Sequence, residues 1–225
     1  MQPLSKVVWS SVGKKFIMAL SGLAMVIFLV EHVIGNLLLY STDSVPYNQY
    51  GDFLVSLGTV LIVVEYVFIA ILLFHAYSGI SIALGKKKAR PENYYKVGSA
   101  GGASRKTISS TTMIYTGILT FVFIIVHLKT FKFGPHYVQQ VDGKEIRDLH
   151  ALVWEVFKNP GYVIFYVVTL LLLGFHLRHG FWSAFQSLGV NHPRYSPFIY
   201  SLGILIAIAV TAGFIGIPVW IYFNS

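Results

Sequence analysis

Four histidines lie inside apolar stretches of the sequence, and each belongs to a different stretch: His32, His75, His127 and His176. Ionisable side chains at membrane depth are costly, so they are rare without a purpose. A single such histidine could equally be a neutral residue that bonds to Ser, Thr or Tyr on a neighbouring helix. The relative depths of the four decide between these interpretations.

The four histidines fall on two levels when depth is counted from the flanking polar residues on one side. At 1.5 Å per helical residue, His32 and His127 lie about 26 and 31 Å deep, whereas His75 and His176 lie about 16 and 15 Å deep. Two histidines on facing helices are the arrangement that holds a haem iron from both sides. The sequence therefore predicts two haems about 15 Å apart, each with both axial positions filled.

Four glycines recur at matched distances from these histidines. Gly79 and Gly180 each follow an inner-level histidine by four residues, which places them one turn along on the same face. Gly22 and Gly117 each precede an outer-level histidine by ten residues, which brings them to the depth of the inner pair. A flat porphyrin needs small side chains beside it, although small residues are also common in ordinary membrane helix packing. We interpret all four as haem-packing positions.

The elements that must position these residues are five apolar stretches, each long enough to cross a bilayer. The chain has 225 residues, of which 55% are hydrophobic and 12% charged, and it contains no cysteine. Thiolate zinc sites, disulfides and cysteine-ligated iron–sulfur clusters are thereby excluded. We predict an all-α integral membrane protein, a single domain over residues 1–225 with five helices bundled around two haems. The expected spans are Phe16–Tyr40, Phe53–Leu84, Ile108–Phe131, Gly161–Phe185 and Pro197–Phe223.

The basic residues predict the orientation. Seven of the 17 Lys and Arg residues lie between Lys86 and Lys106, whereas the connection Ser41–Asp52 has none. Positive loops favour the cytoplasm, so the N-terminus is expected inside and the C-terminus outside. The net charge of +8 is explained by this topology, and we expect contact with membrane lipid and no nucleic-acid partner.

The chain resembles the cytochrome b subunit of succinate dehydrogenase or fumarate reductase, in its five-helix, two-haem form. The resemblance covers nearly the whole length, and its most specific stretch is GFHLRHGFWSAFQSLGVNHPRYSP. The stretches that carry it are Gly13–Tyr40, Phe74–Ile80, Ile124–Gly134, Arg147–Val167 and Gly174–Pro197.

This resemblance implies a membrane anchor with two haem b groups in the cytoplasmic membrane of a prokaryote. His32 and His127 would hold the distal haem, and His75 and His176 the haem nearer an iron–sulfur subunit. The implied partners are that subunit and a flavoprotein, and the implied substrate is menaquinone or another quinone. The anchor would not act on succinate by itself. Ser21 is the residue available for a propionate contact.

Three alternatives remain at this stage. A dihaem anchor of a formate dehydrogenase or hydrogenase would share the composition, with its histidines distributed differently among the helices. A small transporter would need internal repeats or broken helices, and a plain structural membrane protein would need no cofactor.

Several polar residues have weaker assignments. His179, one turn from His176, is an alternative ligand, or it contacts a propionate or lines a pocket near the inner surface. The remaining histidines, in the connections, are expected to be solvated: His136, His150 and His192.

Glu65 is the residue expected to handle protons. It precedes His75 by ten residues, which places it at the level of the outer haem. Burial should raise the pKa of this carboxyl, so that it can exchange a proton with a quinone. The alternatives are a bond to Tyr or Ser on another helix, or a small wet cavity without a redox role. Glu31, beside His32, is a second candidate.

Overall fold

The computed structural model describes residues 6, 9–88 and 107–225, and most of this part of the chain is helical. Five helices in it are long and apolar enough to cross a membrane, as the sequence predicts. The basic segment predicted to be cytoplasmic lies largely outside the described residues. The five spans are α2 (Ser11–Asn36) with the 3₁₀ turn η1 (Leu37–Tyr40), α4 (Thr59–Lys88), α6 (Met113–His127) with the π-helical turn η2 (Leu128–Lys132), α8 (Pro160–Ser187) and α9 (Ser196–Asn224).

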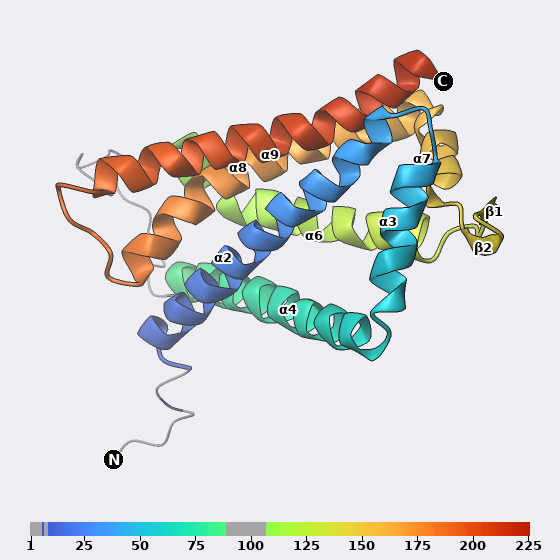
Figure 1. Cartoon of the computed structure of the whole chain (residues 1–225). Helices are drawn as coiled ribbons and strands as arrows, with labels where there is room; N and C mark the ends of the chain where they lie inside the picture. Colours follow the sequence, from blue (N-terminus) through green and yellow to red (C-terminus); the bar gives the residue numbers. More distant parts are fainter. Residues whose placement is uncertain (1–5, 7–8, 89–106) are drawn as a thin grey trace.

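The second expected span begins later than predicted. Phe53 belongs to a separate helix, α3 (Val45–Ser56), which runs across the end of the bundle to link α2 with α4 (Figure 1). Gly58 separates α3 from α4 with φ +55°, a backbone conformation that glycine adopts at little cost. The continuous apolar composition across this glycine hides the break from a hydropathy reading.

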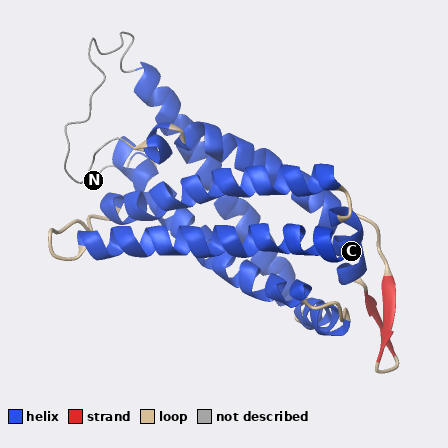
Figure 2. Ribbon diagram, turned by 90° about the horizontal axis from the view of Figure 1, so that it is seen from above, coloured by secondary structure: helices blue, strands red, loops and turns tan. Residues whose placement is uncertain are grey.

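Short elements gather at the end of the bundle where α3 lies. They comprise α3, α7 (Leu149–Phe157) and a hairpin of β1 (Val138–Val141) and β2 (Lys144–Arg147), and we call them the cap (Figures 1 and 2). The strands are antiparallel, and Asp142 and Gly143 form the turn between them with φ of 50° and 76°. Positive φ at both positions is typical of a type I′ hairpin turn. The hairpin corrects the expectation of an entirely α-helical chain.

The core of the bundle is built around α8. Its buried residues include Tyr166, Leu170, Leu173 and Leu177, which recur at helical spacing and pack against α9 and α6. By contrast, no residue in the most apolar part of α4 is buried. In a bilayer this surface is covered by lipid tails, so its exposure carries no hydrophobic cost.

Successive spans run in alternating directions, so the start of α2 and the end of α9 lie at opposite ends of the bundle (Figure 1). A short helix, α5 (Ile108–Thr111), precedes α6 and begins with a capping box. In it, the side chains of Thr107 and Ser110 each accept a hydrogen bond from the other residue's backbone N–H. Thr112, between α5 and α6, has a non-helical φ of −99° and ψ of 2°.

Candidate functional site: two histidine pairs

The structure brings the four membrane histidines together as two separate pairs. His32 of α2 faces His127 of α6, with 5.9 Å between the ring centroids. His75 of α4 faces His176 of α8, with 6.2 Å between the centroids. Each pair therefore joins two helices, and the partners are those that the depth calculation pairs.

These separations suit two imidazoles that bind one iron from opposite sides. An imidazole nitrogen binds a transition metal at about 2.0 Å. Two such bonds and the distance from each nitrogen to its ring centre add up to roughly 6 Å between the centroids. Both observed separations are close to this value.

The inner pair is held by hydroxyl groups on neighbouring helices. Nδ1 of His75 lies 3.1 Å from Oγ of Ser21, whose own hydrogen is directed at the carbonyl of Ile17, 2.6 Å away. A carbonyl can only accept, so Nδ1 of His75 carries the hydrogen and donates it.

The same arrangement recurs around His176. Its Nδ1 lies 3.1 Å from Oγ1 of Thr116, which donates to the carbonyls of Thr112 and Met113 one turn back. With Nδ1 protonated, Nε2 of both inner histidines is left as the basic nitrogen. Metal-binding histidines characteristically donate their second N–H in this way, which fixes the ring orientation.

The outer pair has aromatic surroundings. Nδ1 of His127 lies 3.2 Å from the hydroxyl of Tyr166. Phe28 stacks on His32 with 5.2 Å between centroids and 17° between planes, and Phe214 lies 5.6 Å from the same ring. The surroundings of this pair are thus less polar than those of the inner pair.

The glycines divide into two kinds. A β-carbon on Gly22 would lie 3.3 Å from Cε1 of His75, and one on Gly117 would lie 3.2 Å from Cε1 of His176. Both therefore lie at the inner pair and let its rings approach the helix backbone. A β-carbon on Gly180 would meet nothing within 4 Å, and one on Gly79 only Cε of Met18 at 3.8 Å. Open space, as a flat cofactor requires, therefore lies beside Gly180, whereas Gly79 packs against the end of the Met18 side chain.

Bonds from these histidines to Ser, Thr or Tyr were the alternative left open by the sequence, and the structure shows such bonds at His75 and His176. The sequence also holds a signal for the two hydroxyl partners. Ser21 and Thr116 each precede an outer histidine by 11 residues, immediately before the glycines at ten residues. A Ser-Gly or Thr-Gly pair at one fixed spacing therefore marks both helices. Ser21 was expected near a propionate, but in the structure it contacts the His75 ring instead.

His179 lies half-buried one turn along α8. The ring opposite His75 is that of His176.

Glu65 lies at the expected level but not in the expected surroundings. Tyr166 lies ten residues before the inner His176, and its hydroxyl is within hydrogen-bond distance of the outer His127. Glu65 has the same spacing from the inner His75, so it also lies at the depth of the outer pair. Its carboxylate forms an ion pair with Lys132 of η2, and the two side chains are 39% and 41% exposed. The other helices of the chain therefore enclose Glu65 only in part, and its partner is Lys132 instead of a Tyr or Ser. Glu31 is exposed.

One connection histidine corrects the sequence prediction. His150 is only 6% exposed, stacks on Trp154 and places Nε2 3.1 Å from the carbonyl of Ser41. It was expected to be solvated, but it lies inside the cap because α7 packs against α3. His136 and His192 are exposed, as expected.

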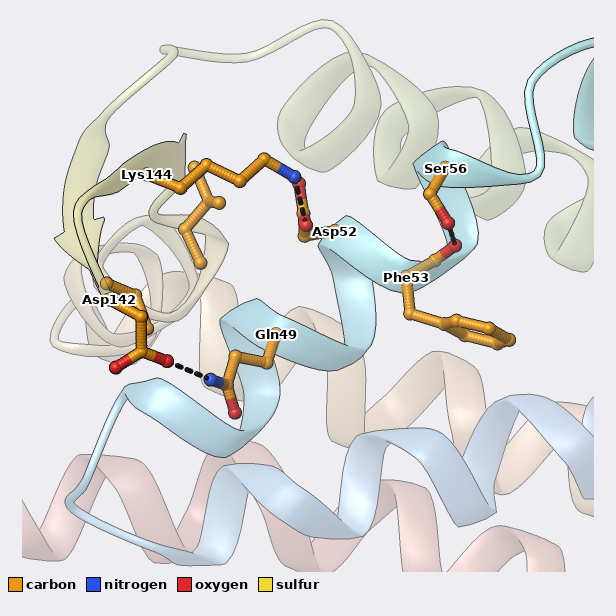
Figure 3. Close-up of a pocket in the computed structure, with 8 residues that line it drawn as sticks. Gln49, Asp52, Phe53, Ser56, Asp142 and Lys144 are labelled. Atoms are coloured by element: carbon orange, nitrogen blue, oxygen red, sulfur yellow. Dashed lines mark hydrogen bonds and ion pairs between the residues drawn. The ribbon is translucent and has the colours of Figure 1, made fainter.

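A cavity of about 480 Å³ lies in the cap between α3 and the hairpin (Figure 3). The Asp52–Lys144 ion pair and the Gln49–Asp142 hydrogen bond cross it. None of the four paired histidines lines it. These interactions tie α3 to the hairpin, so we interpret the cavity as part of the packing of the cap.

Comparisons of the chain with protein-family models, with curated proteins and with solved structures find no match. What the chain does must therefore be inferred from its own residues and their geometry.

Proposed function

We propose that this chain is the dihaem cytochrome b membrane anchor of a succinate:quinone oxidoreductase, passing electrons between an iron–sulfur subunit and a quinone. The proposal is supported by one observation: four histidines on four helices form two separate pairs. The ring centroids are 5.9 Å apart in His32–His127 and 6.2 Å apart in His75–His176. The choice of succinate, rather than another donor, depends on the resemblance in sequence.

The donor set favours haem over a free metal ion. Within the described ranges no group of three or more His, Asp or Glu residues could hold an ion. Two protein ligands are sufficient only when the cofactor brings its own equatorial ligands, as a porphyrin does. Bound haem would supply one-electron redox chemistry. The chain contributes the axial nitrogens, the hydroxyl groups that orient them and the glycines that leave space.

Aromatic residues close in sequence to Glu65 and Lys132 contact the outer pair directly or through one further ring. On α4, Phe68 lies one turn from Glu65, and its ring centroid is 4.1 Å from that of Phe28, which stacks on His32. On η2, Phe131 precedes Lys132, and its ring lies 5.3 Å from that of His127. We assign the quinone site to this edge of the bundle, where Glu65 exchanges a proton with the quinone.

The remaining assignments follow the same proposal. The start of α2 faces the cytoplasm and the end of α9 faces outward, in the inner membrane of a prokaryote. The iron–sulfur and flavoprotein subunits bind on the cytoplasmic side, nearest to His75 and His176. Menaquinone or a related quinone is the membrane substrate.

The deciding experiment is purification of the chain from its natural membrane without prior dissociation of its partners. We expect a reduced b-type spectrum with about two haems per chain, and a co-purifying flavoprotein with succinate dehydrogenase or fumarate reductase activity. A protein without haem would overturn the cytochrome proposal. Two haems with a formate dehydrogenase or hydrogenase partner would overturn only the choice of succinate.

A further inference from the structure

The ring of His32 is held differently from the rings of the other three paired histidines. Nδ1 of His75, His176 and His127 lies 3.1, 3.1 and 3.2 Å from a hydroxyl group on a neighbouring helix. Among the described residues the His32 ring has no such partner, and its neighbours are aromatic rings. A hydrogen bond fixes a ring nitrogen in one direction, whereas aromatic pairs tolerate several arrangements. The direction of the His32 ring therefore depends more strongly on its own backbone.

The backbone of His32 is held by the side chain of Asn36, the last residue of α2. Nδ2 of Asn36 donates to the carbonyl of His32 at 2.7 Å. A side chain that bonds to the carbonyl four residues back offers the backbone an alternative to the regular helix. The α-helix ends at Asn36, and the chain continues as the 3₁₀ turn η1. Asn36 thus acts on the helical turn that carries the His32 ring.

Tyr47 of α3 determines which way the Asn36 amide points. The Tyr47 hydroxyl donates to Oδ1 of Asn36 at 3.1 Å. The His32 carbonyl can only accept a hydrogen bond, so the amide nitrogen must face it, and the amide oxygen is left for the phenol. One orientation of the amide therefore satisfies both partners, and loss of the phenol hydroxyl removes half of what holds it.

The cap fixes Tyr47 itself. Tyr47 is only 7% exposed, and its ring centroid lies 6.4 Å from that of His150 in α7. The next residue, Asn48, bonds to Gln139 of the hairpin and to the backbone N–H of His150. Because α3 crosses the end of the bundle beside the end of α2 (Figure 1), these contacts extend from the cap to the backbone of an outer histidine.

We infer that Tyr47, acting through Asn36, is a positioning residue for His32, so that the cap sets the ligand geometry of the outer haem. The inference rests on the proposed function, since it takes His32 to be an axial ligand. The planes of the His32 and His127 rings are 81° apart, and a turn of the His32 ring changes this angle. The inner pair lies at the other level, away from the cap, so its geometry should not respond.

The test observes the outer haem by electron paramagnetic resonance of the oxidised, purified complex. In a haem iron with two histidine ligands, the largest g value depends on the angle between the two imidazole planes. The outer signal is identified as the one that His127→Ala removes. We expect Tyr47→Phe, which deletes only the hydroxyl, to shift the outer signal by more than the spread among wild-type preparations. The inner signal should stay in place.

Asn36→Leu removes the next group in the same series of contacts, so it should also shift the outer signal. The double variant should show the shift of Asn36→Leu alone, because Tyr47 acts only through Asn36. Tyr50→Phe is the matched control and should leave both signals unchanged. Tyr50 packs against α2 at Gly35, where a β-carbon would lie 2.7 Å from its Cε1, but the hydroxyl that bonds to Asn36 is that of Tyr47.

An unchanged outer signal in Tyr47→Phe would overturn the inference, as would a shift that Asn36→Leu does not share or that grows in the double variant. An equal shift in Tyr50→Phe would also overturn it, because the effect would then come from the packing of α3 in general. None of these results affects the dihaem proposal. A wild-type preparation without haem would instead overturn the proposed function. If Asn36→Leu does not assemble, Tyr47→Phe and its control still decide.

Discussion

Ser21 of α2 and His75 of α4 are joined by a hydrogen bond of 3.1 Å between Oγ and Nδ1. The relationship is repeated between Thr116 of α6 and His176 of α8, also at 3.1 Å. In both cases the residue after the hydroxyl is a glycine against which the histidine ring packs. The helix pairs α2–α4 and α6–α8 thus present the inner histidines in the same way, each with Nε2 available as a ligand.

Replacement of the axial histidines should remove the haems one level at a time. His75→Ala and His176→Ala should both eliminate the inner haem, and His32→Ala and His127→Ala the outer one, because each iron loses one of its two protein ligands. Haem content and the reduced absorption spectrum provide the measurement. Loss of the same spectral component in His32→Ala and His75→Ala would contradict the pairing.

Ser21→Ala should retain both haems but raise the reduction potential of the inner one. The hydrogen bond from Nδ1 increases the basicity of the ligand and so stabilises oxidised iron. Since such a bond contributes about 1 kcal/mol, the shift should be up to about 40 mV. A potentiometric titration followed by absorbance measures it.

Thr169→Ala is the control for Ser21→Ala. Its hydroxyl is also buried, but it bonds to the carbonyl of Phe165 and not to a histidine. An equal shift in both variants would show that the effect does not depend on the His75 contact.

Glu65→Gln should keep both haems and sharply reduce quinone-linked turnover, while electron transfer from succinate to a soluble dye is retained. The amide preserves size and hydrogen bonding but cannot exchange a proton. The measurement compares the two activities in the same preparation. Wild-type quinone activity in this variant would exclude Glu65 as the proton-exchanging group.

Asn48→Ala should loosen the cap. Asn48 is 1% exposed and bonds to Gln139 and Asp148 at 2.7 Å each and to the backbone N–H of His150 at 2.9 Å. Its removal leaves buried polar groups unsatisfied, at a cost of about 1–3 kcal/mol for each neutral group. We expect a lower Tm and faster proteolysis in the hairpin.

Gln140→Ala, at an exposed hairpin position, is the control for Asn48→Ala and should leave both measurements unchanged. Equal stability of the Asn48→Ala protein would show that α3 is held by the bundle alone.

The sequence by itself determined the five spans and the pairing of the four histidines, because hydropathy and a rise of 1.5 Å per residue are properties of each helix alone. Depth follows from counting, so His32 and His127 could be matched without knowing how their helices pack. The break at Gly58 was missed because the residues on both sides of it are equally apolar.

Only the tertiary structure decided which side chains meet across helices. The Ser21–His75 bond depends on the rotation of each helix about its axis, which hydropathy does not fix. Lys132 reaches Glu65 because a π-helical turn changes the direction of its side chain, and His150 is buried because a long connection folds back as the cap. These contacts join residues far apart in the chain, so their partners appear only when the helices are packed together.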